Sequence, residues 1–417
     1  MRLAALTFGV GLLLAASASA AETAPVAVPE PTADAVRFHR TGLALWVVAR
    51  VWSLGVPALI LWSGSSARIR DWAAGRGGRR PWFAAVAAYG AIYLCVDFAL
   101  KLPLRFYAGF VRLHDYGLSV QPLGRWLGDQ AKGLGVEVVG AGLFLWIPYL
   151  LMARSPRRWW LWTGLLVLPL SAFSALIAPT VIDPLYNEFG PMRDKALEAR
   201  IDALARRAGI DGGKIFEVDK SRDTTTVNAY VTGLFGTKRI VLWDTLLDKL
   251  DDDEVLVVMG HEMGHYVLDH VAIGLTLSSL GTIFALALIH GAAYRLIRRH
   301  GPRFGFDRLT DVASAPLILL LAQVTMLAGS PLINASSRYM EHEADRFALE
   351  ITRDNRAAAR GEAKIQVDNL AVPRPDPLSY WMRSTHPSIA ERIDFANRYR
   401  PWELGRPLRY DHLFRDP

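Results

Sequence analysis

The sequence has little cysteine and no apparent internal repeat. Cys95 is the only cysteine among 417 residues, so no disulfide can form within the chain. It lies inside an apolar segment, where we expect a small packing residue rather than a reactive thiol. Hydrophobic residues, by contrast, make up 52% of the chain. This is too apolar for an ordinary soluble protein, and the length leaves room for a membrane region plus a catalytic unit.

Six stretches are long and apolar enough to cross a bilayer, which requires roughly 20 residues of helix. They lie at about 42–62, 82–103, 136–152, 159–182, 271–294 and 312–334. The alternative, that they are buried helices of a large soluble core, is disfavoured by their length and by the arginine-rich breaks between them. We therefore expect an integral membrane protein.

The first 20 residues are a separate apolar stretch. One arginine, an apolar run from Leu3 to Ala15 and the small residues Ala18-Ser19-Ala20 are typical of a secretory signal peptide, predicted over 1–20. The apolar run is close to the lower length limit for spanning, so an uncleaved first membrane helix is the alternative.

The net charge of +7 does not indicate nucleic-acid binding, because arginines gather in loops that follow three of the spans. These loops begin at Arg68, Arg154 and Arg295. By the positive-inside rule they are cytoplasmic, which places 183–270 and 335–417 together on the extracytoplasmic face. We divide the chain into a four-helix membrane domain, 38–190, and a catalytic domain, 191–417, that includes a transmembrane hairpin at 271–334.

The composition changes between the fourth and fifth spans. An amphipathic helix is predicted over 192–209, and a small sheet follows it. Its strands are expected at Lys214–Val218, Thr226–Val231 and Arg239–Trp243. Asp251 to Asp253 then offer N-caps, with Glu254 three residues after the first, for a helix expected to continue with almost no break into the fifth span. A final short helix is predicted over 389–398.

The segment His261-Glu262-Met263-Gly264-His265 contains the first chemical motif. Two histidines four residues apart share one helix face, where they can bind a single tetrahedral zinc ion. Glu262 lies about 100° round the helix from His261, so it can reach a metal-activated water as general base without itself binding the metal.

A catalytic zinc requires a third protein ligand, and Glu341 is the candidate. The hairpin 271–334 returns the chain to the side it left, which brings Glu341 towards the two histidines. Asp345, four residues later on the same face, can accept the free N–H of a zinc-bound histidine. Taken alone, this segment also fits a solvated, charged helix start. His270, His342 and Glu343 are predicted to point away from the metal and to have surface or interface roles instead.

These motifs together resemble the M48 peptidases, and among them the Ste24-type CAAX prenyl proteases. The resemblance covers about residues 38–400 and lies in the His261–His265 motif and four further segments: Pro179–Asn187, Asn228–Tyr230 with Lys238–Thr245, Ser337–Asp345, and Thr385-His386-Pro387 with Glu391-Arg392. It implies a mainly α fold, a polytopic membrane helical barrel with a gluzincin-like zinc metalloprotease domain that carries a small β-sheet.

The resemblance also implies roles for individual residues. Zinc would be held by His261, His265 and Glu341, with Glu262 as general base and Asp345 behind the ligands. The remaining implied site residues are Asn228, Ala229 and Tyr230, as an edge strand that pairs with an extended peptide, His386, as a donor to the oxyanion, and Arg392, as a substrate contact. An ordinary sheet strand and a helix-start histidine before Pro387 are the alternatives for the edge strand and for His386.

The expected function is that of a membrane zinc metalloendopeptidase with one zinc ion per chain. Its partners would be the lipid bilayer and a peptide or protein substrate, lipidated or membrane-associated, and its role would be envelope protein quality control in a bacterial inner membrane. Two features of this chain depart from the family. Family members usually have seven spans, whereas here the first apolar stretch is predicted to be a cleavable signal peptide. Eukaryotic relatives face the cytosol, whereas here the active site is expected on the extracytoplasmic face. The alternatives are a di-iron membrane oxidase or desaturase, and a non-catalytic membrane chaperone.

Overall fold

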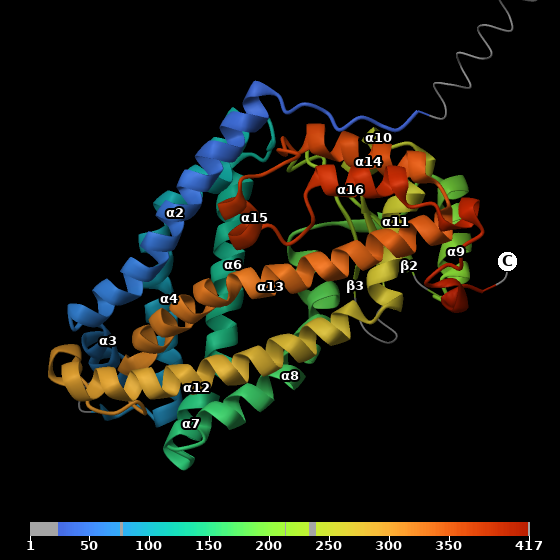
Figure 1. The fold of residues 1–417 in the computed structure, drawn as a ribbon. Coiled ribbons are helices and arrows are strands. Elements are labelled where there is room, and N and C mark those ends of the chain that lie inside the picture. Colours follow the sequence, from blue (N-terminus) through green and yellow to red (C-terminus); the bar gives the residue numbers. More distant parts are fainter. Residues whose placement is uncertain (1–23, 76–77, 213, 233–238, 416–417) are drawn as a thin grey trace, which may run out of the picture.

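The computed structural model describes residues 24–75, 78–212, 214–232 and 239–415 (Figure 1). The predicted signal peptide, 1–20, therefore lies outside the described residues. Within them, six helical stretches are long and apolar enough to cross a membrane. Their main helices are α2 (Ala33–Trp62), α4 (Trp82–Phe106), α6 (Leu123–Phe144), α8 (Trp159–Ile177), α12 (His270–Phe304) and α13 (Ala315–Thr352). Each of the six predicted spans falls within one of these stretches.

The long helices expose much of their apolar surface. Leu332 of α13 is 77% exposed and Phe284 of α12 is 66% exposed, although both are large hydrophobic residues. Helices that are apolar on their outer faces are stable only where lipid replaces water. The exposed side chains therefore agree with the composition in placing these helices in a bilayer.

The helices of the membrane part are joined at one end by a buried cluster. Tyr89, Trp159 and Phe304 lie in its core and are at most 1% exposed. The Tyr89 hydroxyl is 2.7 Å from Ser66 Oγ, and Ser66 donates to the Ala313 carbonyl at 2.6 Å. This cluster connects α3 (Ser65–Ala74) and α4 to the connection between α12 and α13, which is the hairpin turn.

The predicted catalytic domain, called the catalytic part below, contains a four-stranded sheet with the order β1-β2-β4-β3. The strands are β1 (Phe189–Pro191), β2 (Lys214–Val218), β3 (Ala229–Thr232) and β4 (Arg239–Trp243). β2 and β4 are parallel and have the predicted bounds, whereas β3 begins three residues later than predicted. β1 was not predicted, because a three-residue strand with glycine and proline has no alternating pattern; its antiparallel pairing with β2 defines it.

Helices surround this sheet on the right of Figure 1. They include α9 (Lys195–Arg207), α10 (Asp244–Lys249), α11 (Asp252–Val267), α14 (Asn355–Asp368) and α16 (Ile389–Arg398). α15 (Pro377–Arg383) packs against α13 and lies nearer the membrane helices in Figure 1. The predicted capping box at Asp251 and Glu254 starts α11, and α16 has its predicted bounds. Ile201, Leu242, Met259 and Phe347 are fully buried between α9, the sheet, α11 and α13, and they form the core of this part.

An extended segment, residues 24–32, lies over α14 and α16 before α2 begins (Figure 1). Val26 and Asn397 exchange two hydrogen bonds of 3.0 and 2.9 Å, and Gln366 donates to the Pro29 carbonyl at 2.9 Å. The start of the first described membrane helix is thereby fastened to the catalytic part.

The junction between α11 and α12 differs from the prediction of an almost continuous helix. α11 ends at Val267, and Asp269 has a φ of 55°, in the left-handed region that ends a helix. His270 then begins α12 in a new direction. The prediction was wrong here because no glycine or proline marks the break.

Candidate metal centre and active site

Three side-chain atoms converge between α11 and α13. His261 Nε2 lies 3.1 Å from His265 Nε2 and 3.2 Å from Glu341 Oε2, and His265 Nε2 lies 3.4 Å from Glu341 Oε1. A tetrahedral ion with bonds of about 2.0–2.1 Å requires ligand atoms about 3.3 Å apart. Glu341 Oε2 is also buried without a hydrogen-bond partner. The donor set and its spacing therefore fit a zinc ion.

Two helices create this convergence. His261 and His265 are one turn apart on α11, and Glu341 lies on α13, which continues unbroken from the membrane span to Thr352. The helices pack closely because α11 has glycines at the contact: a Cβ on Gly264 would lie 3.2 Å from Ala344 Cα, and one on Gly260 would lie 3.3 Å from Ala348 Cα. Small residues at this contact are thus a condition for the metal site.

Gly264→Ala is expected to destabilise the protein by about 1–3 kcal/mol and to weaken metal retention, because the new methyl group must push α13 away. Thermal unfolding in detergent and metal content after dialysis would measure both effects. Gly274→Ala, which meets no atom within 4 Å, is the matched control. A Gly264→Ala protein as stable and as metal-rich as this control would contradict the packing argument.

A carboxylate holds the ligand imidazole of α11 from behind. His261 Nδ1–H donates to Asp345 Oδ1 at 2.8 Å, which leaves Nε2 directed at the other ligands. Burial lowers the pKa of His261, but the neighbouring carboxylates of Asp345 and Glu341 outweigh it and raise the pKa to about 10. The carboxylates around this imidazole therefore stabilise positive charge, either on the ring or on a bound metal cation.

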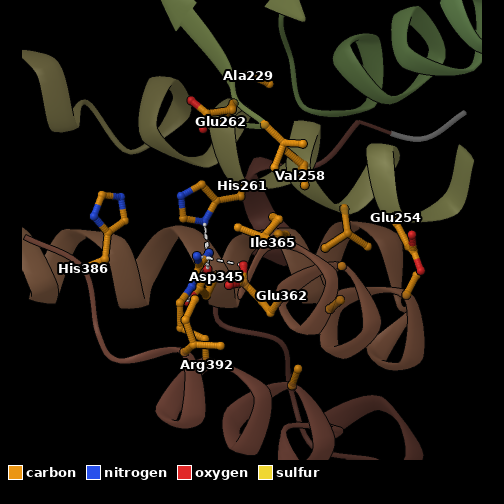
Figure 2. Close-up of a pocket in the computed structure, with 18 of the residues that line it drawn as sticks. Ala229, Glu254, Val258, His261, Glu262, Asp345, Glu362, Ile365, His386 and Arg392 are labelled. Atoms are coloured by element: carbon orange, nitrogen blue, oxygen red, sulfur yellow. Dashed lines mark hydrogen bonds and ion pairs between the residues drawn. The ribbon is translucent and has the colours of Figure 1, made fainter. Parts of the chain in front are cut away.

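Glu262 lies beside His261 in Figure 2 and is not one of the three converging residues. Burial raises the pKa of Glu262, and the backbone N–H of Val231 in β3 donates to its carboxylate. β3 pairs only with β4 among the described strands, so its other edge is unpaired. Asn228, just before β3, is exposed, whereas Ala229 is 5% exposed. The predicted edge strand and the predicted base are therefore neighbours.

His386 reaches the same site from the segment between α15 and α16. Its Nε2 lies 3.2 Å from Glu341 Oε2, and its side chain is 56% exposed. Arg392 of α16 lies deeper, behind Asp345, with its side chain 14% exposed. That position suits a contact with Asp345 better than the direct substrate contact that the sequence suggested for Arg392.

His270 was assigned a surface or interface role, but it lies against the metal centre. It is 8% exposed, and its Nδ1 is 3.0 Å from His265 Nδ1. The break at Asp269 explains the difference, because α12 starts in a direction that returns His270 to α11. No local sequence pattern signals this contact.

His342 and Glu343 face away from the metal centre, as predicted. The His342 ring packs against Phe395 with centroids 4.4 Å apart. Glu343 is buried and contacts Tyr410, Arg346 and Arg409 near the C-terminus. Both residues connect α13 to the segments behind it.

A cavity of about 320 Å³ extends from the active-site residues into the catalytic part (Figure 2). His261, Glu262 and His386 line it on one side, and apolar residues such as Val258 and Ile365 line its depth. Glu362 of α14 lies at its wall, 2.7 Å from Arg392, and sequence reasoning had not singled it out.

Comparisons with known proteins agree with this architecture. Residues 191–400 match the Peptidase family M48 domain, and residues 17–188 match the CAAX prenyl protease N-terminal domain with five membrane helices. The chain is 38% identical to the metalloprotease YhfN of Bacillus subtilis, over 83% of this chain and 82% of that one. It is 33% identical to a CAAX prenyl protease 1 homolog of Dictyostelium discoideum, over 71% and 69% of the two chains.

The fold has also been observed in a crystal structure. S. mikatae Ste24p superposes with a TM-score of 0.74 at 25% identity, covering 86% of this chain and 87% of that one. These findings support neither the di-iron oxidase nor the non-catalytic chaperone. The chain belongs to peptidase family M48 and is an integral-membrane metalloprotease of the Ste24 type.

Proposed function

We propose that the protein is a zinc-dependent endopeptidase that cleaves peptide bonds at the membrane surface. The observation that supports this most is the spacing of 3.1 to 3.4 Å among the converging atoms of His261, His265 and Glu341. Purely oxygen donor sets suit magnesium, calcium or manganese, whereas two imidazoles and one carboxylate with an open position are typical of catalytic zinc.

The residues around the zinc site would divide the work of hydrolysis. Zinc, when bound, polarises the scissile carbonyl and lowers the pKa of a water molecule. Glu262 takes the proton of the attacking water and returns it to the leaving amine. Its half-buried position and raised pKa suit a group that must both accept and donate this proton. The unpaired edge of β3 would hold the peptide in an extended conformation.

His386 is proposed to donate to the oxyanion that forms on the attacked carbonyl. His386→Ala should lower kcat roughly 100-fold, as the loss of one oxyanion donor does in other hydrolases, while the metal content stays unchanged. Because His386 is exposed and contacts Glu341 only at 3.2 Å, little stability should be lost. An unchanged kcat would remove His386 from the reaction.

The location follows from the helices and the charges. The same helix, α13, crosses the predicted membrane region and carries Glu341, so the site is close to the bilayer surface. From the arginine-rich loops we propose that the site faces the extracytoplasmic side, and from the predicted secretory signal peptide that the membrane is a bacterial inner membrane. A C-terminal alkaline phosphatase fusion should then be active, and an inactive phosphatase with a fluorescent C-terminal reporter would reverse the orientation.

We retain 38–190 as the membrane domain and 191–417 as the catalytic domain, with 1–20 as a signal peptide or first anchor. Lipidated and other membrane-associated peptides are the proposed substrates, because the site is near the bilayer and two relatives are named CAAX prenyl proteases. N-terminal sequencing of the purified protein would decide between the signal peptide and the anchor.

The direct test is metal analysis and a peptide-cleavage assay on the detergent-purified protein. One zinc per chain, together with cleavage that a chelator stops and zinc restores, is the expected result. Two irons per chain, or no cleavage of lipidated or unmodified peptides at full zinc loading, would overturn the proposal.

A further inference from the structure

Arg392 lies between two carboxylates that come from different helices. Its Nη2 donates to Asp345 Oδ1 at 2.6 Å and its Nε to Asp345 Oδ2 at 2.9 Å, on α13. On the opposite side, its Nη1 is 2.7 Å from Glu362 Oε1, on α14. The three side chains are 10 to 14% exposed. Dashed lines in Figure 2 follow this chain of contacts to His261.

The balance of charge along this chain bears on the metal site. Asp345 must keep enough negative charge to accept the N–H of His261, because that hydrogen bond makes the imidazole a better metal ligand. If the Arg392 guanidinium were paired with Asp345 alone, it would neutralise the negative charge of Asp345 in a poorly solvated site. Glu362 shares the Arg392 guanidinium with Asp345, so Asp345 remains available to His261.

Among the residues that the structure describes, no partner other than Arg392 explains the position of Glu362. Glu362 is one of the residues that line the cavity, and its Oε2 is buried without a hydrogen-bond partner. Burying a carboxylate with one oxygen unsatisfied costs about 1–3 kcal/mol, so an ordinary structural role would be served better by an apolar side chain. The contact with Arg392 therefore explains why a carboxylate, and not an apolar side chain, lies at this position.

We propose that Glu362 is a positioning residue for the metal centre, acting through Arg392 and Asp345 on His261. It holds the guanidinium from the side of α14, so that Asp345 keeps the orientation and the charge that His261 requires. This inference depends on the metal site proposed above, but not on which peptide is cleaved.

Two variants separate charge from contact. Glu362→Met removes both the charge and the acceptor, and it should lower zinc affinity about tenfold, the lower end of the effect of outer partners of a ligand. Glu362→Gln keeps an acceptor for Arg392 and should have an intermediate affinity. Asp368→Asn is a matched change on the same helix, at a residue that is ion-paired with Lys249, and it should leave the zinc affinity unchanged.

Zinc affinity would be measured by chelator competition, and unfolding midpoints would be recorded with and without zinc. We expect the zinc-free midpoint of Glu362→Met to stay at or above that of the control, the zinc-induced rise to shrink, and kcat to fall with KM unchanged. Wild-type zinc affinity in Glu362→Met would overturn the inference. So would a lower midpoint in both states with no change in affinity, which identifies a purely structural residue.

The proposed function and this inference fail in different ways. If the wild type binds zinc but cleaves no peptide, the endopeptidase proposal fails, while the zinc affinities still test Glu362. If peptides are cleaved and the affinities of Glu362→Met and the wild type are equal, the inference alone fails.

Discussion

Glu262→Gln is expected to lower the rate of peptide cleavage by about 10²–10⁴-fold and to leave the zinc content at one per chain. The Glu262 carboxylate lies beside His261 in Figure 2 and is not among the three proposed ligands. An amide of the same shape retains the hydrogen bond from Val231 but cannot take a proton from water. The change therefore separates proton transfer from metal binding.

The measurement is kcat for a fluorogenic peptide, together with metal analysis of the same sample. Glu403→Gln, at a side chain that is 53% exposed, is the matched control and should behave as the wild type. Cleavage at the wild-type rate by Glu262→Gln would remove Glu262 from its role as base. In cells, proteins that accumulate with this variant but not with the wild type would identify the physiological substrates.

Glu341→Gln is expected to remove the metal. Loss of an outer partner of a ligand already costs about 10–100-fold in affinity, so loss of the charged ligand itself should exceed about 100-fold. The amide leaves His261 and His265 without the anion that now lies 3.2 and 3.4 Å from their Nε2 atoms. Both the zinc content and the cleavage activity should fall to background.

Chelator-sensitive unfolding gives a readout that does not depend on activity. Bound zinc stabilises the wild type, so a chelator should lower its unfolding midpoint, whereas the midpoint of Glu341→Gln should not respond. His342→Gln is the neighbouring control, because its ring packs on Phe395 and not on the metal centre. A full complement of zinc in Glu341→Gln would contradict the ligand assignment.

Part of the fold could be predicted because its signals are local. The capping box at Asp251 and Glu254, the β-branched runs of β2 and β4, and the amphipathic spacing of α16 are each contained in a few consecutive residues. The six spans were visible for the same reason, since a bilayer imposes length and apolarity on every helix that crosses it. β1 escaped prediction because only its pairing with β2 defines it.

The candidate site could likewise be predicted only where its signals are local. The spacing of His261 and His265 on one helix face is a property of adjacent turns, and a hairpin of two spans must return Glu341 to the side where the histidines lie. The sequence was therefore sufficient to name the three residues that converge. It could not show their spacing of 3.1 to 3.4 Å, which depends on how closely α11 and α13 pack through Gly260 and Gly264.

Two further contacts near these three residues were decided by tertiary structure alone. His270 returns to His265 because one residue, Asp269, adopts a left-handed conformation, and Glu362 meets Arg392 because α14 packs beside α16. Neither contact has a fixed spacing along the chain, since each depends on the relative orientation of two helices. Local patterns thus specified the elements and the chemistry of the ligands, whereas packing between elements specified what holds those ligands in place.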